Sequence, residues 1–366
     1  MHACCRPSWT KAEARARISS VIEKLWLQNF GCVKEAEIGL TPIHVLIGPN
    51  DSGKSTILRA VEGLASFAAG SPLPDKAWAL LREPGASVEG GHSRGHLGVK
   101  RTEAGLFEVA GHTPEPTRGK LAPAAARIDR GFSAQKTREL PDVFSPVAKS
   151  FLVRFEPDQL RQRTGLLPDT QPIRFLDEKG LGLPAVYDAL VNREVESFLA
   201  IGRKVQDLFP SVKSLSLKNP SGAEKALAIR LQDGQEVGAD MMSEGLLYYL
   251  AFAVLPYLEP VAVILVEEPE NGLHPARITE VMATLREISK TTQVLIATHS
   301  PLVVNEMRPD EVSIVTRTAA LGTKVTRLPD TQGFEKRTKL YAPGEMWLNY
   351  ANGTDESPLL NGGPRP

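Results

Sequence analysis

Residues 43–56 constrain the fold more than any other part of the sequence. The almost entirely apolar run IHVLI at residues 43–47 is followed at once by GPNDSGKST at residues 48–56. The run predicts a strand that is buried on both faces. The second stretch fits G-x-x-x-x-G-K-[ST], the pattern of a loop that holds phosphate groups between a strand and a helix. The sequence therefore predicts a strand, a phosphate-binding loop and a helix over about residues 55–67.

Each part of this loop has an expected chemical role. Gly48 and Gly53 permit backbone angles that side chains exclude, so the loop can turn its N–H groups inward. Lys54 is expected to reach the β- and γ-phosphates, and the Ser55 hydroxyl is expected to ligate Mg²⁺. Thr56 is expected near the α-phosphate. The other predicted phosphate-loop residues are Pro49, Asn50, Asp51 and Ser52.

A second apolar strand ends in two carboxylates. Residues 263–270 read VILVEEPE, and magnesium-dependent phosphoryl transfer uses one acid for the metal and another for the attacking water. We predict that Glu267 holds Mg²⁺ and that Glu268 positions and polarises the water. The alternative is a solvated strand end before a proline turn.

Two further segments carry candidate site residues. Residues 293–301, QVLIATHSP, deliver His299 to the carboxyl end of a strand, the edge of a parallel sheet where ligands bind. Residues 242–246, MSEGL, begin a buried helix with Ser243 as its N-cap and Gly245 exposing backbone N–H groups. That helix start is predicted to bind the γ-phosphate held by a second subunit. The alternatives are a structural histidine and an ordinary capped core helix.

The remaining pattern predicts an α/β protein with a mostly parallel central sheet covered by helices on both faces. Glycine, proline and short alternating pieces between about residues 70 and 124 predict a small antiparallel β subdomain or a mobile insertion. Further strands, helices and a hairpin are expected, followed by a polar tail. The expected strands are at 21–28, 149–155, 261–266, 293–297 and 311–316, and the expected helices at 184–208, 244–255 and 275–290.

The composition restricts the class of protein and the cellular compartment that we expect. The 366 residues carry 43 basic and 43 acidic side chains, so the chain as a whole is not a basic nucleic-acid binder. Three cysteines are too few for a disulfide framework. The first 20 residues lack an apolar signal core, and no apolar run reaches the length of a membrane span. We expect a cytoplasmic protein with no membrane partner.

The order GPNDSGKST, MSEGL, VILVEEPENGLHP and ATHSP resembles the ABC-type ATPases of the RecF, SMC and OLD group, in particular compact RecF-like ATPases without a long coiled coil. The likeness covers about residues 21–66 and 184–350, and residues 70–145 show none. It implies an extension at 1–20, an ABC-type P-loop NTPase domain at 21–345 with an insertion at about 70–145 and a helical lobe at about 184–210, and a tail at 346–366.

The resemblance also implies roles for single residues. Ser243 and Gly245 match the signature motif, in which Glu244 replaces a glycine, and Glu267 stands where many relatives have aspartate. His299 matches the switch histidine. A γ-phosphate-sensing glutamine is expected, and Gln135 and Gln159 both remain candidates. The loop that faces the partner copy is expected at Asn271, Gly272, Leu273 and His274.

By resemblance, two copies would enclose two ATP molecules with Mg²⁺, and hydrolysis would reopen this clamp. The expected setting is DNA repair or bacterial anti-phage defence, with a separately encoded effector or DNA as further partner. The alternatives are a transporter ATPase subunit and a non-hydrolysing scaffold. An OLD-type nuclease is not favoured, because only 67 residues follow His299. Contact with DNA is an open alternative for the basic residues Arg94, Lys100, Arg101, Arg118, Lys120, Arg127 and Arg130.

Overall fold

The computed structural model describes residues 22–69, 75–81, 83–92, 95–101, 107–112, 126–128, 149–318, 322–331 and 333–351. The chain divides into two units. The first comprises Met1–Phe151, Val261–Leu265 and Ile288–Pro366, and the second comprises Leu152–Pro260 and Val266–Glu287. The expected extension at 1–20, the last 15 residues of the chain and much of the expected insertion lie outside the described residues.

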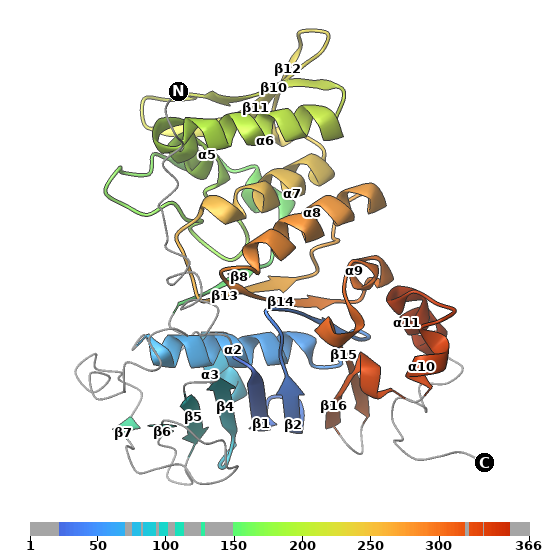
Figure 1. Cartoon of the computed structure of the whole chain (residues 1–366). Helices are drawn as coiled ribbons and strands as arrows, with labels where there is room; N and C mark the ends of the chain where they lie inside the picture. Colours follow the sequence, from blue (N-terminus) through green and yellow to red (C-terminus); the bar gives the residue numbers. More distant parts are fainter. Residues whose placement is uncertain are drawn as a thin grey trace, which may run out of the picture. The chain divides into compact units, whose positions relative to one another are not determined.

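A six-stranded sheet contains the strand that precedes the phosphate loop (Figure 1). Its order is β16-β15-β3-β14-β13-β8, and β3 pairs in parallel with both β14 and β15. Parallel neighbours bury β3 completely, which confirms the prediction from its apolar run. The strands are β3 (Ile43–Ile47), β8 (Ser150–Val153), β13 (Val263–Glu267), β14 (Gln293–Thr298), β15 (Val312–Thr318) and β16 (Gly322–Arg327).

An antiparallel sheet of the first unit confirms the antiparallel strands expected after residue 70. These strands join the N-terminal hairpin in the order β2-β1-β4-β5-β6-β7. Helix α2 (Lys54–Ala68) packs against β14 of the central sheet and against β1, β4 and β5 of this one. The phosphate-loop helix is therefore held between two sheets (Figure 1). The other elements are β1 (Lys24–Phe30), β2 (Val33–Gly39), α3 (Asp75–Leu80), β4 (Ser87–His92), β5 (Gly95–Arg101), β6 (Phe107–His112) and β7 (Ala126–Ile128).

The second unit contains the helices expected between residues 184 and 290. The predicted helical segment is split at Glu194, whose φ of −142° interrupts the helical path. The expected hairpin is formed by β10 and β11, which pair antiparallel. The elements are α4 (Pro157–Leu160), β9 (Thr164–Gly165), α5 (Leu183–Arg193), α6 (Val195–Leu208), β10 (Val212–Lys218), β11 (Glu224–Leu231), β12 (Glu236–Gly238), α7 (Glu244–Ala253) and α8 (Pro275–Ile288).

The C-terminal region corrects the expected polar tail. Strand β16 extends the central sheet, and the helices α10 (Phe334–Arg337) and α11 (Pro343–Ala351) follow it. Helix α11 packs on α9 (Pro301–Asn305), and the Gly344 N–H donates to Asn305 Oδ1 at 2.8 Å. Met346 and Trp347 are buried. The sequence pattern missed these elements because each is short and has few apolar residues, so neither the helical nor the strand period is evident.

His44 is a fully buried polar residue and the second residue of β3. Its Nε2 lies 2.9 Å from Ser313 Oγ on β15, and its Nδ1 lies 3.0 Å from Thr41 Oγ1. Burial, and to a smaller extent the nearby positive charge of Arg327, lower the pKa of His44 to about 3 against the opposing effect of Glu311. The imidazole is therefore neutral in the folded protein at neutral pH and joins two strands through hydrogen bonds.

We expect His44 to make the protein acid-sensitive. Between its unfolded pKa of 6.5 and its folded value of about 3, the unfolded chain binds a proton that the folded chain does not, so the free energy of unfolding falls as pH falls. Between pH 7 and pH 5 this contribution is about 2 kcal/mol. Urea unfolding at both pH values should show a smaller loss for His44→Gln than for wild type. Equal losses would contradict the prediction.

Candidate nucleotide-binding site

The phosphate loop connects the end of β3 at Ile47 to the start of α2 at Lys54. Gly53 closes the loop with φ of 108°, a conformation that side chains rarely adopt. A Cβ on Gly48 would lie 2.0 Å from the backbone oxygen of Val315 on β15, so only glycine fits there. Gly53 therefore allows a left-handed turn, and Gly48 allows a close approach to the neighbouring strand. Both uses agree with the prediction that the loop needs glycine at these positions.

Lys54 is buried inside the loop that it is predicted to serve. Its Nζ donates to the carbonyl oxygens of Gly48 at 2.8 Å and Pro49 at 2.9 Å. An ammonium group in this place is partly desolvated, so its attraction for a polyphosphate is stronger than that of a surface lysine. Its two carbonyl bonds fix the side chain across the loop, where its charge faces the ligand that the loop would hold.

The start of α2 fits a phosphate group and a metal. No acidic residue lies in the first turn of the helix, so nothing opposes the positive end of its dipole. Ser55 is exposed at this end, as a metal ligand must be, and Thr56 follows it half-buried. Ser52 Oγ is buried without a hydrogen-bond partner within the described residues. The helix start and the two serine hydroxyls suit a nucleoside triphosphate with Mg²⁺.

Strand β16 holds the loop from outside, which sequence reasoning missed. Thr323 Oγ1 donates to the Ser52 carbonyl at 2.9 Å and lies 3.5 Å from the Cys32 thiol. The thiol also lies 3.4 Å from Thr56 Oγ1. Arg317 of β15 donates to the Asp51 carbonyl at 3.4 Å. Because Cys32, Arg317 and Thr323 belong to no phosphate-loop motif, only the tertiary packing around the loop reveals them.

We expect Thr323→Val to weaken nucleotide binding about fivefold. The variant keeps the volume of the side chain but loses the bond to Ser52, worth about 1 kcal/mol, that holds the loop in its binding conformation. Calorimetric titration with a nucleoside triphosphate measures this, and Thr323→Ser should retain near wild-type affinity. If valine and wild type bind equally, the hydroxyl does not position the loop.

His299 follows β14 beside the start of the phosphate loop. In the parallel register Thr298 pairs with Ile47, so His299 and Gly48 are the next residues of neighbouring strands. Thr298 Oγ1 accepts from the Ser300 N–H at 2.8 Å, and the Ser300 hydroxyl caps α9. The turn that carries His299 is thereby anchored on both sides, and its ring is exposed. The predicted place of His299 after the carboxyl end of a buried strand is confirmed, and its contact with the γ-phosphate stays a prediction.

Glu267 and Glu268 belong to the second unit and differ in environment. Glu267 ends β13, is buried and lies 3.6 Å from Arg154 Nη1. Glu268 is half-buried and has φ of 48°, an uncommon conformation for a residue with a side chain. Such backbone strain concentrates at functional sites and supports a special role for Glu268. The two carboxylates are therefore suited to different roles.

Ser243 caps α7 as predicted, since its side chain accepts from the Leu246 N–H at 3.4 Å. Gly245 lies against the loop after β13: a Cβ there would be 3.1 Å from the Gly272 oxygen. Gly272 has φ of 67°, and a Cβ on it would be 2.4 Å from the Tyr248 ring. Gly272 is thus required for packing within this unit, and a side chain at position 245 would fit tightly, whatever a partner copy contacts.

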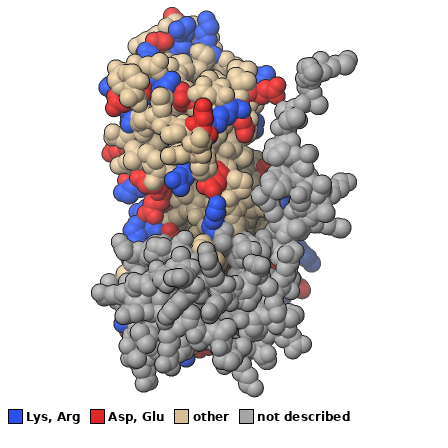
Figure 2. All heavy atoms as spheres, turned by 90° about the vertical axis from the view of Figure 1, so that its left-hand side faces the viewer, with Lys and Arg blue, Asp and Glu red and all other residues tan. Residues whose placement is uncertain are grey.

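The candidate glutamines and the basic residues considered for DNA contact are only partly covered by the described residues. Gln159 lies half-buried in α4, whereas Gln135 lies outside the described residues, so the choice between the two glutamines is open. Of the basic residues considered for DNA contact, Arg94, Arg118, Lys120 and Arg130 are outside the described residues, and the Arg127 side chain is not described either. On the face in Figure 2, the described acidic and basic side chains are interspersed. The described residues on that face therefore show no basic patch for a phosphate backbone.

Known families match both parts of the chain that carry these motifs. The family model described as "AAA domain, putative AbiEii toxin, Type IV TA system" matches residues 134–305, and the model "AAA ATPase domain" matches residues 21–76. The OLD nuclease of Thermus scotoductus is 38% identical over 42 residues, which are 12% of this chain and 8% of the nuclease. The match thus spans only a small part of that relative.

Solved structures show the same fold. An SMC head bound to the C-winged helix domain of ScpA is 17% identical, with a TM-score of 0.55 over 83% of this chain and 97% of that one. A Pyrococcus furiosus SMC head with an extended coiled coil, bound to the C-terminal domain of ScpA, is 16% identical, with a TM-score of 0.52 over 87% and 98%. In the described part of the chain, no helix has the length and apolar character that crossing a membrane requires.

Proposed function

Because this chain is an AAA-type ATPase with the fold of an SMC head, we propose that it binds and hydrolyses Mg·ATP and that ATP joins two copies into a clamp. The observation that carries the proposal is the phosphate loop. It combines a buried Lys54, a left-handed Gly53 and an exposed Ser55 at a helix start without acidic residues. This set of groups recognises a polyphosphate with its metal.

The proposed mechanism assigns one task to each group. Lys54 would neutralise the β- and γ-phosphates, and the loop amides would hold them. Ser55 and Glu267 would hold Mg²⁺, which would supply further charge neutralisation. Glu268 orients a water molecule and accepts its proton, while His299 contacts the γ-phosphate. In the partner copy, the start of α7 at Ser243 would complete the shell around the γ-phosphate. Hydrolysis removes this bridging group, so the copies separate.

We further propose that the clamp acts in bacterial defence or DNA maintenance in the cytoplasm, with DNA or a separately encoded protein as its partner. The family description that names a toxin of a type IV toxin–antitoxin system supports a defence role. The likeness to a segment of an OLD nuclease agrees with a role on nucleic acid. The SMC heads solved with a ScpA domain support a protein partner.

Analytical ultracentrifugation tests the clamp directly. The protein is sedimented without nucleotide, with Mg·ATP and with Mg·ADP, each with and without duplex DNA. A monomer that becomes a dimer with ATP alone is the expected result, and co-sedimentation would identify DNA as a partner. A monomer under every condition would contradict the clamp. ATP-dependent dimerisation without phosphate release would instead identify a non-hydrolysing scaffold.

A further inference from the structure

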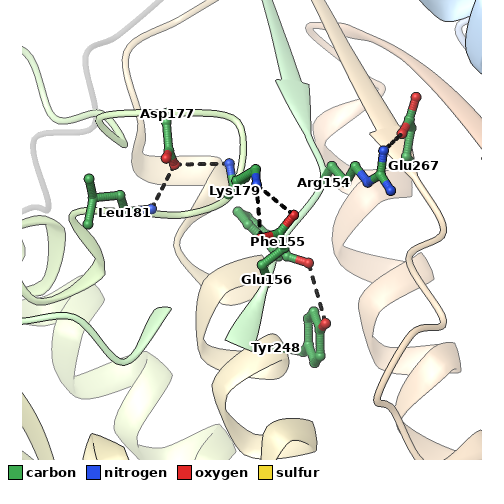
Figure 3. A network of polar contacts seen from close by, with 8 residues as sticks. All are labelled: Arg154, Phe155, Glu156, Asp177, Lys179, Leu181, Tyr248 and Glu267. Carbon is green, nitrogen blue, oxygen red and sulfur yellow. Dashed lines mark hydrogen bonds and ion pairs between the residues drawn. The ribbon is translucent and has the colours of Figure 1, made fainter. Parts of the chain in front are cut away.

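A network of polar contacts fixes the backbone just after β8 (Figure 3). The Arg154 N–H donates to the Glu178 carbonyl at 2.8 Å, and the Glu156 N–H donates to the Lys179 carbonyl at 3.0 Å. Lys179 Nζ forms an ion pair with Glu156 at 3.0 Å. The turn that supplies these carbonyls is itself closed by Asp177, whose Oδ1 accepts from two backbone N–H groups at 2.9 Å. Arg154 therefore starts from a rigid backbone position.

The same segment is anchored from the other side by α7. The Tyr248 hydroxyl donates to the Phe155 carbonyl at 3.3 Å (Figure 3). Burial raises the pKa of Tyr248, so the hydroxyl stays protonated and available as a donor. The Phe155 ring packs against Phe175 and Phe252, with ring centroids 5.2 and 5.1 Å apart. The residue after Arg154 is thus fixed through both its backbone and its side chain.

From this base the Arg154 side chain extends to the end of β13. Its Nη1 lies 3.6 Å from the Glu267 carboxylate (Figure 3). The two side chains differ in exposure: Glu267 is 6% exposed and Arg154 is 58% exposed. A buried carboxylate needs a positive neighbour, since desolvation without one is costly. The Arg154 guanidinium can supply that charge. It can also move away from the carboxylate, because more than half of the Arg154 side chain is exposed to water.

We propose that Arg154 is a positioning residue that holds the Glu267 carboxylate and supplies its positive partner until Mg²⁺ arrives with the nucleotide. The inference rests on the proposed function, in which Glu267 takes part in metal binding. A guanidinium this close to the carboxylate opposes a second cation, so metal entry requires the ion pair to open. Arg154 thereby lowers the affinity of the site for Mg²⁺ and keeps Glu267 oriented while no nucleotide is bound.

The proposal predicts a change in metal dependence. Wild type and Arg154→Gln are titrated with Mg²⁺ at a fixed, subsaturating ATP concentration, and ATP binding is followed by calorimetry. The Mg²⁺ concentration at half-maximal binding should be about threefold to tenfold lower for Arg154→Gln, a modest factor because the guanidinium is largely solvated. ATP binding in EDTA should be unchanged. Arg154→Lys should give an intermediate midpoint, and Arg174→Gln, which removes an exposed charge from the same unit, should match wild type.

Three results would overturn the inference. An unchanged or higher midpoint for Arg154→Gln would show that the arginine does not compete with the metal. Weaker ATP binding in EDTA would show that Arg154 binds the phosphates instead. Wild-type protein that binds no nucleotide at any Mg²⁺ concentration would overturn the proposed function and this inference with it. If wild type binds nucleotide but has the same Mg²⁺ midpoint as Arg154→Gln, only the inference about Arg154 fails and the proposed function stands. Thermal melting verifies that each variant is folded.

Discussion

Lys54→Ala is expected to abolish detectable ATP binding. The side chain is buried in the phosphate loop and donates to two loop carbonyls, which hold its charge within the loop. Hydrogen bonds to charged groups contribute about 1.5 to 3 kcal/mol each, so losing two of them to the phosphates weakens binding at least about a hundredfold. Isothermal titration calorimetry with Mg·ATP on folded protein measures the loss.

A control separates this effect from a general loss of positive charge. Lys213 is an exposed lysine on β10, and Lys213→Ala should bind ATP like wild type. Circular dichroism should show that both variants retain their helices and strands. If Lys54→Ala bound ATP with unchanged affinity, residues 48–56 would not be the phosphate-binding loop and the proposed function would lose its basis.

Glu268→Gln is expected to bind ATP normally and to hydrolyse it about a hundredfold to ten-thousandfold more slowly. Glutamine has the shape of glutamate but cannot accept the proton of the attacking water. The strained backbone of Glu268, with φ of 48°, is unaffected by this exchange of one atom. Because the γ-phosphate then persists, the clamp should stay closed. Single-turnover phosphate release and sedimentation with Mg·ATP measure the two effects.

The neighbouring glutamate provides the comparison. Glu267→Gln should raise the Mg²⁺ requirement of ATP binding, because it weakens a metal contact, whereas Glu268→Gln should leave that requirement unchanged. Glu280→Gln on α8 removes a carboxylate from the same unit and should behave like wild type. Hydrolysis at the wild-type rate by Glu268→Gln would reassign the proton acceptor to Glu267 or to another residue.

Strand and helix limits near the phosphate loop were predictable because the pattern there is strong. The run at 43–47 coincides with β3, and the predicted helix start at residue 55 differs by one residue from the observed Lys54. The signals failed in the C-terminal region, where β16 was interpreted as part of a polar tail. Most of its side chains are half-buried, so apolar and polar positions do not alternate clearly.

The candidate site residues also fall into two sets, those that the sequence predicted and those that it did not. Lys54, Ser55, Glu268 and His299 could be predicted as site residues because each belongs to, or directly follows, a buried strand or a loop with a recognisable run of consecutive residues. Arg154 and Thr323 were missed. Nothing beside them in the sequence distinguishes them from other surface arginines and strand threonines, and their importance comes from Glu267 and from the Ser52 carbonyl.

The sequence by itself determined the phosphate loop, the paired acids at a strand end and the capped helix, because glycine geometry, backbone amides and strand-end acids act over a few neighbouring residues. Only the tertiary structure decided what holds these groups in place. Thr323 reaches Cys32 across 291 positions of sequence, and Arg154 reaches Glu267 from the end of β8. Such contacts depend on strand order and side-chain packing, and many distant segments together set both.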